Sequence, residues 1–277
     1  MLSLQNCPHP TLAPLASDPS SLRFGAANWH DFLRSRLAGL ACVWRDDRFP
    51  SGELLTRMRS AFGFRIVDPD GTVIGSGDGP CPVELGFDGV SLIHPWDLLA
   101  VSEMFLDELS ENHICGEIHP AAVIDGRIEL GEGSRILPGV YIEGNCVIGR
   151  DCKIGPNCYL RGRTVIGDRC HIGQAVEIKN SIIGSRTSIG HLSYVGDSVI
   201  GERVNFGAGT IIANLRHDGR NHRSLIDGTL TDTGRRKFGA IVGDDVHTGI
   251  HTAIYPGRKL FPGSSTSPGE IVRHDLR

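Results

Sequence analysis

The chain has 277 residues, 40% of them hydrophobic, and its 28 Lys and Arg are nearly balanced by 32 Asp and Glu, which gives a formal net charge of -4. This length suits one long or two ordinary domains with a real core, and the charge balance does not favour a nucleic-acid partner. No apolar stretch approaches the roughly 18 residues of a membrane-spanning helix, and the N-terminus lacks the basic and apolar regions of a secretory signal, so we expect a soluble, cytoplasmic protein without a membrane partner.

Residues 1–113 are predicted to form a small α/β module. Amphipathic patterns predict helices over 29–44 and 51–61, and Pro95 is expected to open a third helix that runs to Leu109. Between them, an alternating pattern over 64–74 predicts a hairpin that turns at Asp68-Pro-Asp-Gly71. No sequence pattern assigns a function to this module.

A six-residue repeat follows and predicts the fold of residues 114–277. An aliphatic residue occupies every sixth position, a period that belongs neither to a helix nor to a single strand. It is typical of a parallel β-helix, in which each repeat forms one short strand and a turn, and three repeats close one triangular coil. We therefore expect a mainly β protein. The unbroken series is Ile124, Leu130, Ile136, Ile142, Ile148, Ile154, Leu160, Ile166, Ile172 and Ile178.

Residues 213–240 interrupt this repeat. They are polar and basic and have no six-residue rhythm, so we expect them to leave the wall of the solenoid before the repeat resumes at Val242. Long excursions from a rigid scaffold frequently carry function.

The cysteines are interpreted as packing residues and not as ligands of a metal. Half of the eight occupy the narrow corner position of the repeat, and the sequence contains no Cys-x-x-Cys pair, so we expect buried, reduced thiols. The four corner residues are Cys146, Cys152, Cys158 and Cys170.

Polar side chains are predicted to converge on one outer face of the solenoid. Arg161 and Lys179 are one 18-residue coil apart, and each follows an inward aliphatic residue, so they should lie one above the other. Tyr194 and Asn214 fall on that face in the next coils, with His191 at the corner leading into it. Outward cations are commonly solvated, but a guanidinium beside an ammonium suits a phosphate, and histidine accepts protons near neutral pH.

Several clustered motifs resemble one enzyme family. The segments Val176-Glu-Ile-Lys-Asn180, Gly190-His-Leu-Ser-Tyr-Val-Gly-Asp197, Val204-Asn-Phe-Gly-Ala-Gly-Thr210 and Asn214-Leu-Arg are similar to the acetyltransferase domain of the bifunctional glucosamine-1-phosphate acetyltransferase / N-acetylglucosamine-1-phosphate uridylyltransferase family. The loop ending Asp232-Thr-Gly-Arg-Arg-Lys-Phe-Gly-Ala240 resembles the archaeal-type sugar-1-phosphate nucleotidylyltransferase/acetyltransferases. The resemblance covers about residues 95–260, and nothing in the first 113 residues resembles the uridylyltransferase domain.

The resemblance implies a left-handed parallel β-helix, although parallel crossovers are usually right-handed, and a homotrimer with sites between subunits. It also implies acetyl-CoA as co-substrate, with no metal needed for acetyl transfer. Position by position, His191 resembles the catalytic base, with Asn205 beside it, while Ile250 stands where the bacterial family has a serine near the coenzyme. The sugar-phosphate pocket corresponds to Arg161, Lys179, Tyr194, Asn214 and the loop lysine Lys237, and the coenzyme positions to Ala208, Ile250 and Lys237.

We therefore expect an acetyl-CoA-dependent N-acetyltransferase acting on an amino-sugar 1-phosphate, glucosamine-1-phosphate first and galactosamine-1-phosphate next. In such a reaction the base removes a proton from the amine as it attacks the thioester, and the cations fix the phosphate. Three alternatives stay open: acetylation of an amino sugar already attached to a nucleotide, a non-catalytic sugar-nucleotide-binding scaffold, and a γ-type carbonic anhydrase-like metalloenzyme. The last rests on the spacing of His217 and His222.

Overall fold

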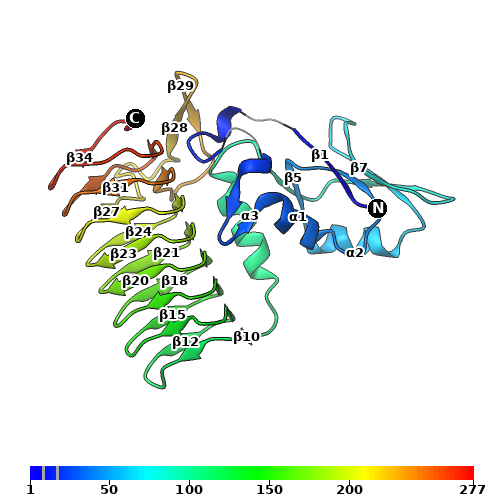
Figure 1. Cartoon of the computed structure of the whole chain (residues 1–277). Coiled ribbons are helices and arrows are strands. Elements are labelled where there is room, and N and C mark those ends of the chain that lie inside the picture. Colours follow the sequence, from blue (N-terminus) through cyan, green and yellow to red (C-terminus); the bar gives the residue numbers. More distant parts are fainter. Residues whose placement is uncertain (8–9, 17–18) are drawn as a thin grey trace.

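The computed structural model describes residues 1–7, 10–16 and 19–277 and is dominated by a parallel β-solenoid (Figure 1). Its coils stack from β12 (Val123–Asp125) at one end to β34 (Ile271–Val272) at the other, and the N-terminal part of the chain lies against its side. The wall consists of three parallel sheets, which we name after their first strands as the β10 face, the β11 face and the β12 face.

The strands of each face are short. The β10 face contains β10 (His113–Ile114), β13 (Ile128–Leu130), β16 (Cys146–Ile148), β19 (Thr164–Ile166), β22 (Ile182–Ile183), β25 (Val199–Ile200), β30 (Ala240–Val242) and β33 (Arg258–Leu260). The β11 face contains β11 (Glu117–Ile118), β14 (Arg135–Ile136), β17 (Lys153–Ile154), β20 (His171–Gln174), β23 (Ser188–His191), β26 (Asn205–Phe206) and β31 (His247–Thr248). The β12 face continues through β15 (Tyr141–Glu143), β18 (Tyr159–Arg161), β21 (Glu177–Lys179), β24 (Tyr194–Gly196), β27 (Ile211–Ile212) and β32 (Ala253–Ile254) to β34.

The aliphatic residues of the six-residue repeat form the core of the solenoid. On the β12 face Leu160, Ile178, Val195, Ile212 and Ile254 are in register, one above the other, and all are buried. Together with their equivalents on the other two faces they make one continuous apolar cluster along the axis. The predicted fold class, a left-handed parallel β-helix of hexapeptide repeats with a small N-terminal α/β part, is confirmed.

The four corner cysteines are buried and free, as expected. The Sγ atom of Cys152 donates to the carbonyl of Gly167 at 3.0 Å and accepts the backbone N–H of Cys170 at 3.4 Å. Burial raises the pKa of Cys158 to about 12, so this thiol stays protonated at neutral pH and acts as an apolar filler of the corner.

The N-terminal part combines three helices with small sheets. Two of the predicted helices are confirmed with slightly shorter bounds, and the hairpin turns as predicted, with the N–H of Gly71 donating to the carbonyl of Asp68 at 2.8 Å. The helices are α1 (Trp29–Arg36), α2 (Gly52–Ser60) and α3 (Asp97–Asp107), with 3-10 turns η1 (Pro10–Leu12) and η2 (Pro19–Ser21). The main sheet has the order β1 (Ser3–Gln5), β4 (Val43–Arg45), β7 (Val73–Gly77), β6 (Phe64–Val67), β8 (Val83–Gly86), and the paired strands are β2 (Arg23–Phe24) with β3 (Ala27–Asn28) and β5 (Arg48–Pro50) with β9 (Gly89–Ser91).

The predicted helix over 29–44 is wrong in its second half. Helix α1 ends at Arg36, Gly39 follows at φ +83°, and the chain then forms β4, which pairs with β1 and β7. The buried Trp44 packs so closely on Gly75 of β7 that a Cβ there would lie 2.4 Å from the indole. This contact between distant parts of the chain overrides the local helical pattern.

The N-terminal part and the solenoid share a hydrophobic core. Val165, Ile182, Val199 and Ile241 point outward from the β10 face, yet each is at most 3% exposed because the N-terminal part covers them. Burying one such side chain contributes about 1.5–3 kcal/mol, so the contact is a substantial one. Helix α3 lies along this side of the solenoid, beside the ends of the strands (Figure 1).

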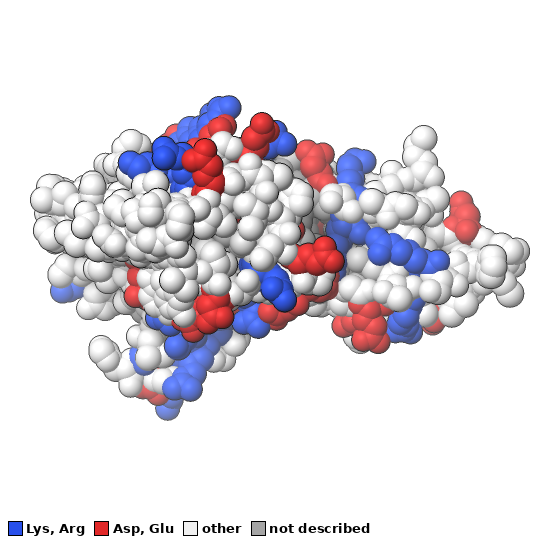
Figure 2. All heavy atoms as spheres, turned by 90° about the horizontal axis from the view of Figure 1, so that it is seen from below, with Lys and Arg blue, Asp and Glu red and all other residues white. Residues whose placement is uncertain are grey.

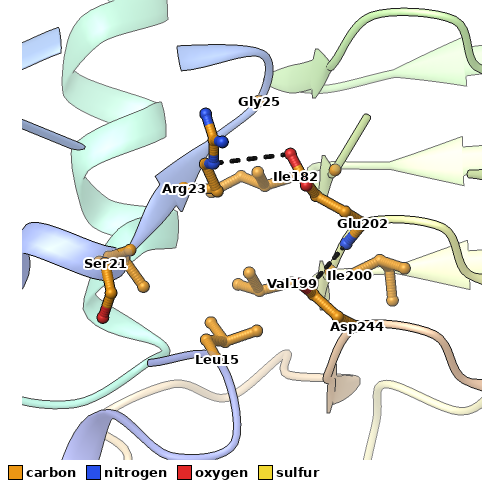
Figure 3. Close-up of a pocket in the computed structure, with 12 residues that line it drawn as sticks. Leu15, Ser21, Arg23, Gly25, Ile182, Val199, Ile200, Glu202 and Asp244 are labelled. Carbon is orange, nitrogen blue, oxygen red and sulfur yellow. Dashed lines mark hydrogen bonds and ion pairs between the residues drawn. The ribbon is translucent and has the colours of Figure 1, made fainter. Parts of the chain in front are cut away.

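A small cavity of about 200 Å³ remains where the two parts meet (Figure 3). Leu15 and Ser21 line it from the N-terminal side, and Val199 lines it from the β10 face. Arg23 reaches across to Glu202, with its Nε atom 3.6 Å from the carboxylate. The cavity therefore lies at the contact between the two parts of the chain.

Charged side chains of both signs are interspersed on the end of the molecule that carries β12, as expected for a nearly balanced chain (Figure 2). Within the described residues, no helix is both long enough and apolar enough to cross a bilayer.

Candidate active site

The β12 face brings Arg161 and Lys179 side by side. Arg161 in β18 is in register with Lys179 in β21, and the next position in β24 is Gly196. Both cations follow an inward aliphatic residue, which is why both point outward, as the 18-residue spacing predicts. Tyr194 lies two positions earlier on the same strand as Gly196 and pairs with Glu177.

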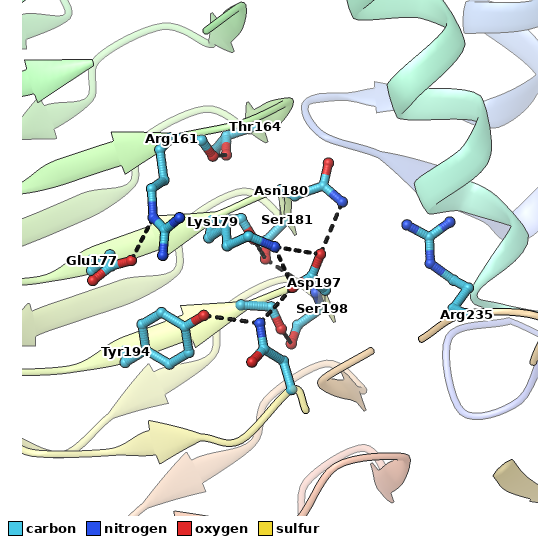
Figure 4. Close-up of polar contacts among 12 residues, drawn as sticks. Arg161, Thr164, Glu177, Lys179, Asn180, Ser181, Tyr194, Asp197, Ser198 and Arg235 are labelled. Carbon is cyan, nitrogen blue, oxygen red and sulfur yellow. Dashed lines mark hydrogen bonds and ion pairs between the residues drawn. The ribbon is translucent and has the colours of Figure 1, made fainter. Parts of the chain in front are cut away.

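Lys179 is held by a buried aspartate. Its Nζ atom lies 2.9 Å and 2.7 Å from the two carboxylate oxygens of Asp197, and the two side chains are 14% and 3% exposed. Asn214 donates from Nδ2 to Asp197 at 2.5 Å, and Asn180 does so at 3.1 Å (Figure 4). Asp197 therefore fixes three side chains of the face at once.

Gly196 makes room for this arrangement. A Cβ at position 196 would lie 2.4 Å from the Tyr194 hydroxyl and 2.6 Å from Nδ2 of Asn214, so the tyrosine ring lies over a bare stretch of backbone. The hydroxyl accepts a hydrogen bond from Asn214 at 2.9 Å and keeps its own proton free to donate. Burial, helped by the charge of Asp197, raises the pKa of Tyr194 above its ordinary value of 10, so the hydroxyl stays protonated at neutral pH.

Arg161 has a more accessible partner. Its Nε atom donates to Glu177 at 2.7 Å, and its guanidinium lies 5.6 Å from the centroid of the Tyr159 ring. The two side chains of the pair are 36% and 33% exposed. An exposed pair of this kind contributes about 0–1 kcal/mol, so an incoming anion can displace Glu177 from Arg161 at small cost.

His191 borders the same face from its other edge. It ends β23 on the β11 face, three residues before Tyr194, and its imidazole is exposed. Among the residues the structure describes, no hydrogen bond or ion pair joins this imidazole to Arg161 or Lys179. The two cations lie at the ends of β18 and β21, whereas His191 lies at the corner where the chain enters the β12 face.

The remaining predicted residues lie along that corner and in the loop. Asn205 is exposed on the β11 face, and Ala208 and Ile250 follow at the corner above His191, stacked through backbone hydrogen bonds from Gly209 to His191 at 3.2 Å and from His251 to Ala208 at 2.8 Å. Lys237 lies in the excursion, where it is exposed and forms an isolated antiparallel bridge with Leu215. Asn205 is thus on a different face from the cation pair.

The excursion leaves the wall after β27, as predicted, and also forms a hairpin of β28 (Arg223–Ile226) and β29 (Thr229–Asp232). Its His222 is buried and donates from Nε2 to the carbonyl of Asn214 at 3.0 Å. Burial lowers the pKa of His222, which keeps the ring neutral at pH 7. In the described part of the chain, no group of three or more His, Cys, Asp or Glu side chains could hold a metal ion, and this histidine instead anchors the loop.

A basic groove of about 650 Å³ lies between the excursion and the last coils. Tyr255 and Arg273 line it, and each follows the inward residue of its coil, as Arg161 and Lys179 do further down the β12 face. Arg216 also lines the groove and is paired with Asp218 at 2.6 Å. The other arginines of the groove are Arg223 and Arg258.

Comparisons with known proteins match the C-terminal part of the chain. Residues 142–257 match the family model described as the GMPPB C-terminal domain. The "Bifunctional sugar-1-phosphate nucleotidylyltransferase/acetyltransferase" of Sulfurisphaera tokodaii is 43% identical over 182 residues, which are 66% of this chain and 45% of that protein. The C-terminal part of the chain is related to these bifunctional enzymes. The "Bifunctional protein GlmU" of Methanococcus maripaludis is 44% identical over 183 residues, which are 66% of this chain and 44% of the relative. The chain spans less than half the length of the curated relatives it matches.

Three residues that complete the site were not among those predicted from the sequence. Asp197, Asn180 and Gly196 all lie at or beside turns, and the first two have positive φ angles of 50° and 45°. A signal was present, because Asp197 is 18 residues after Lys179 and so one coil away with the opposite charge. Such spacing in a hexapeptide repeat indicates an ion pair between coils.

Proposed function

We propose that the chain is an acetyl-CoA-dependent N-acetyltransferase acting on an amino-sugar 1-phosphate, and that residues 114–277 carry this activity. The observation that carries the proposal is the Arg161–Lys179 pair, in register on one face and next to the network of Tyr194 and Asn214. The name of the Sulfurisphaera relative, a sugar-1-phosphate nucleotidylyltransferase/acetyltransferase, supports the substrate class.

The charges of the site explain how it would hold a phosphate. Lys179 is fixed by Asp197, which is buried, so the ammonium is already in place when the substrate arrives. Arg161 is paired with the accessible Glu177, so its guanidinium can turn to the phosphate and bind two oxygens at once. The preorganised ammonium of Lys179 and the exchangeable partner of Arg161 together favour binding of an anion.

The chemistry requires one base. As the neutral amine attacks the thioester carbon, a C–N bond forms and His191 removes the surplus proton of the amine. The tetrahedral intermediate then collapses, the C–S bond breaks, and the thiolate of coenzyme A leaves and takes up a proton. For the exposed imidazole of His191 to take this proton, the substrate must lie against the corner that carries it. Ala208 and Ile250 would then line the path of the acyl donor.

Self-association is part of the proposal. The corner that carries His191 also carries Leu192, which is 62% exposed, and Ile250, which is 51% exposed. Exposed aliphatic side chains next to a polar site are typical of an interface. We propose a homotrimer in which this corner meets the neighbouring chain, so that the space between His191 and the cation pair is closed by a second subunit. Light scattering at three times the mass of one chain is the expected result.

A second candidate is acetylation of an amino sugar that is already attached to a nucleotide. The basic groove beside the site favours it, because Tyr255 is 50% exposed and can stack on a base while Arg223 and Arg273 face a diphosphate. The cation pair alone suits the smaller sugar phosphate, which we rank first.

One assay tests the function. The purified chain is incubated with acetyl-CoA and glucosamine-1-phosphate, galactosamine-1-phosphate, a nucleotide-linked amino sugar or free glucosamine, and free thiol is followed. Release that depends on a 1-phosphate supports the first candidate, and release only with the nucleotide-linked sugar supports the second. If none of the four acceptors releases thiol, the proposed function is wrong.

A further inference from the structure

The side chain of Glu103 connects the N-terminal part to the candidate site by hydrogen bonds. Glu103 lies in the middle of helix α3, and its carboxylate contacts two groups that belong to the solenoid side. Its Oε1 atom accepts a hydrogen bond from Nδ2 of Asn180 at 2.9 Å. The same carboxylate forms an ion pair with Arg235, in which Oε2 lies 3.3 Å from Nη1 and Oε1 accepts a shorter hydrogen bond from Nη2.

The first of these contacts continues directly into the site. Nδ2 of Asn180 is shared between Glu103 and Oδ1 of Asp197, which is 3.1 Å away. Asp197 in turn holds Lys179 and Asn214. Three hydrogen bonds, through Asn180 and Asp197, therefore connect the carboxylate on α3 with the ammonium of Lys179. Figure 4 shows the last two of them.

The second contact holds the returning arm of the excursion. Arg235 lies two residues before Lys237 and three before Phe238, whose N–H donates to the carbonyl of Asn214 at 3.0 Å. The next residue, Gly239, donates to the carbonyl of Asp197 at 2.8 Å. One carboxylate on α3 thus fixes both the wall and the loop that returns to it.

These contacts stabilise an unusual backbone conformation. Asn180 and Asp197 both have left-handed conformations, with φ angles of 45° and 50°, and they stack through N–H donors to Arg161 at 2.9 Å and to Lys179 at 2.8 Å. Among residues other than glycine, Asn and Asp adopt this conformation most readily, and the side-chain hydrogen bonds of Asn180 and Asp197 help to keep it. The stacked turns that contain Asn180 and Asp197 therefore set the positions of Arg161 and Lys179.

We infer that Glu103 is a positioning residue, through which the N-terminal part sets the geometry of the sugar-phosphate site. It holds Asn180 and Arg235 so that Asp197 keeps Lys179 and Asn214 in place and the arm carrying Lys237 stays against the wall. The substrate in this inference rests on the proposed function, whereas the mechanical role of Glu103 does not. The N-terminal part is accordingly a mechanical support, or brace, for the site. Its contact with the solenoid is explained by this role without a catalytic activity of its own.

A matched control exists on the same helix. Asp107 also forms an ion pair from α3 to the solenoid, with Arg163 at 2.6 Å and 2.8 Å. Within the described residues, Arg163 forms no hydrogen bond or ion pair with Asp197 or with the excursion. Loss of either pair weakens the docking of α3 on the solenoid. Only loss of the Glu103 contacts is expected to reach the site.

The experiment compares Glu103→Ala, Glu103→Gln and Glu103→Asp with Asp107→Asn in the full chain. Glu103→Ala is expected to raise KM for the sugar phosphate about tenfold, the effect of losing hydrogen bonds to a charged group, with a smaller change in KM for acetyl-CoA. The KM of Glu103→Gln should fall between those of the unaltered chain and Glu103→Ala. Its amide oxygen can still accept a hydrogen bond from Asn180, but the neutral side chain cannot balance the charge of Arg235. Glu103→Asp is expected to restore part of the loss, and Asp107→Asn should leave KM unchanged.

Amide hydrogen exchange gives a readout that does not need activity. Glu103→Ala is expected to speed exchange at Phe238 and Gly239 about tenfold relative to the unaltered chain, and Asp107→Asn is not. Equal exchange in these two variants would overturn the inference, whether or not the protein transfers acetyl groups. Absence of thiol release in the unaltered chain, with the exchange difference present, would contradict the proposed function and leave the brace standing.

Discussion

Lys179 and Asp197 form an ion pair on the outer side of the solenoid wall, with Nζ 2.7 Å and 2.9 Å from the two carboxylate oxygens. Asp197 lies in the turn after β24, one coil beyond the strand β21 that carries Lys179. The pair therefore ties two coils together at the place where the proposed substrate binds. Since Asn180 and Asn214 share the same carboxylate, its removal affects more than one partner.

Replacing Asp197 is therefore expected to be costly. Asp197→Ala leaves the ammonium of Lys179 with little access to water and without a counter-charge, which costs about 3–5 kcal/mol and lowers Tm by roughly 10 °C. Thermal unfolding followed by circular dichroism measures this. The control is Asp151→Ala, another turn aspartate with positive φ whose pair with Arg169 is exposed and 3.8 Å long. Equal losses of Tm in the two variants would contradict the special role of Asp197.

Gly196 is expected to tolerate no side chain. Gly196→Ala places a methyl group 2.4 Å from the Tyr194 hydroxyl, so the ring must move and Asn214 loses its partner. Overpacking of this kind costs about 1–3 kcal/mol. Gly190→Ala is the matched control, because a Cβ at that position meets nothing within 4 Å. We expect a lower Tm for Gly196→Ala only, and a crystal structure of Gly196→Ala should show the displaced tyrosine.

Glu177 is expected to compete with the phosphate for Arg161. Glu177→Gln removes the competing charge, and because the Arg161 guanidinium is then free to bind the anion, KM for the sugar phosphate should fall a few-fold. Arg161→Ala should raise that KM by tenfold or more, the effect of losing about 1.5–3 kcal/mol from a charge-assisted contact. Steady-state kinetics on both variants decide the point: a higher KM for Glu177→Gln would mean that the glutamate serves to position Arg161.

His222 is expected to make the loop sensitive to acid. Its folded pKa lies below the ordinary value of 6.5 because the ring is buried, so the unfolded chain takes up a proton at a higher pH than the folded chain does. The stabilisation is thus complete above pH 6.5 and is lost as the pH falls through the folded pKa. Between pH 7.5 and pH 5, Tm should drop further for the unaltered chain than for His222→Gln. The exposed His217 of the same loop provides the control, and His217→Gln should keep the slope of the unaltered chain.

Much of this architecture can be predicted from the sequence, because the six-residue period is a local property of the chain. The stacking of Arg161 on Lys179 follows from the 18-residue coil alone. Docking of the N-terminal part also leaves a trace in the sequence. Apolar residues precede the inward aliphatic at Val165, Ile182 and Val199, which indicates that this face of the solenoid is covered.

Other features depend on contacts that no local pattern reveals. Trp44 lies in a strand and not in a helix because β1 and β7 pair with it from distant positions. The slip of one residue between β21 and β24 brings Gly196, and not Asp197, into register with Lys179. The aspartate therefore lies at the turn, where its side chain can fold back toward the ammonium. Counting coils predicts that the two residues are close but does not give this geometry.

The most direct test of the account is thiol release from acetyl-CoA with glucosamine-1-phosphate, compared between the unaltered chain and His191→Ala. We expect release that requires the 1-phosphate in the unaltered chain and a loss of at least about a hundredfold in His191→Ala, with the oligomeric state and Tm unchanged. Turnover by His191→Ala at the rate of the unaltered chain would contradict the assigned base. Equal turnover of glucosamine with and without the phosphate would contradict the role of Arg161 and Lys179.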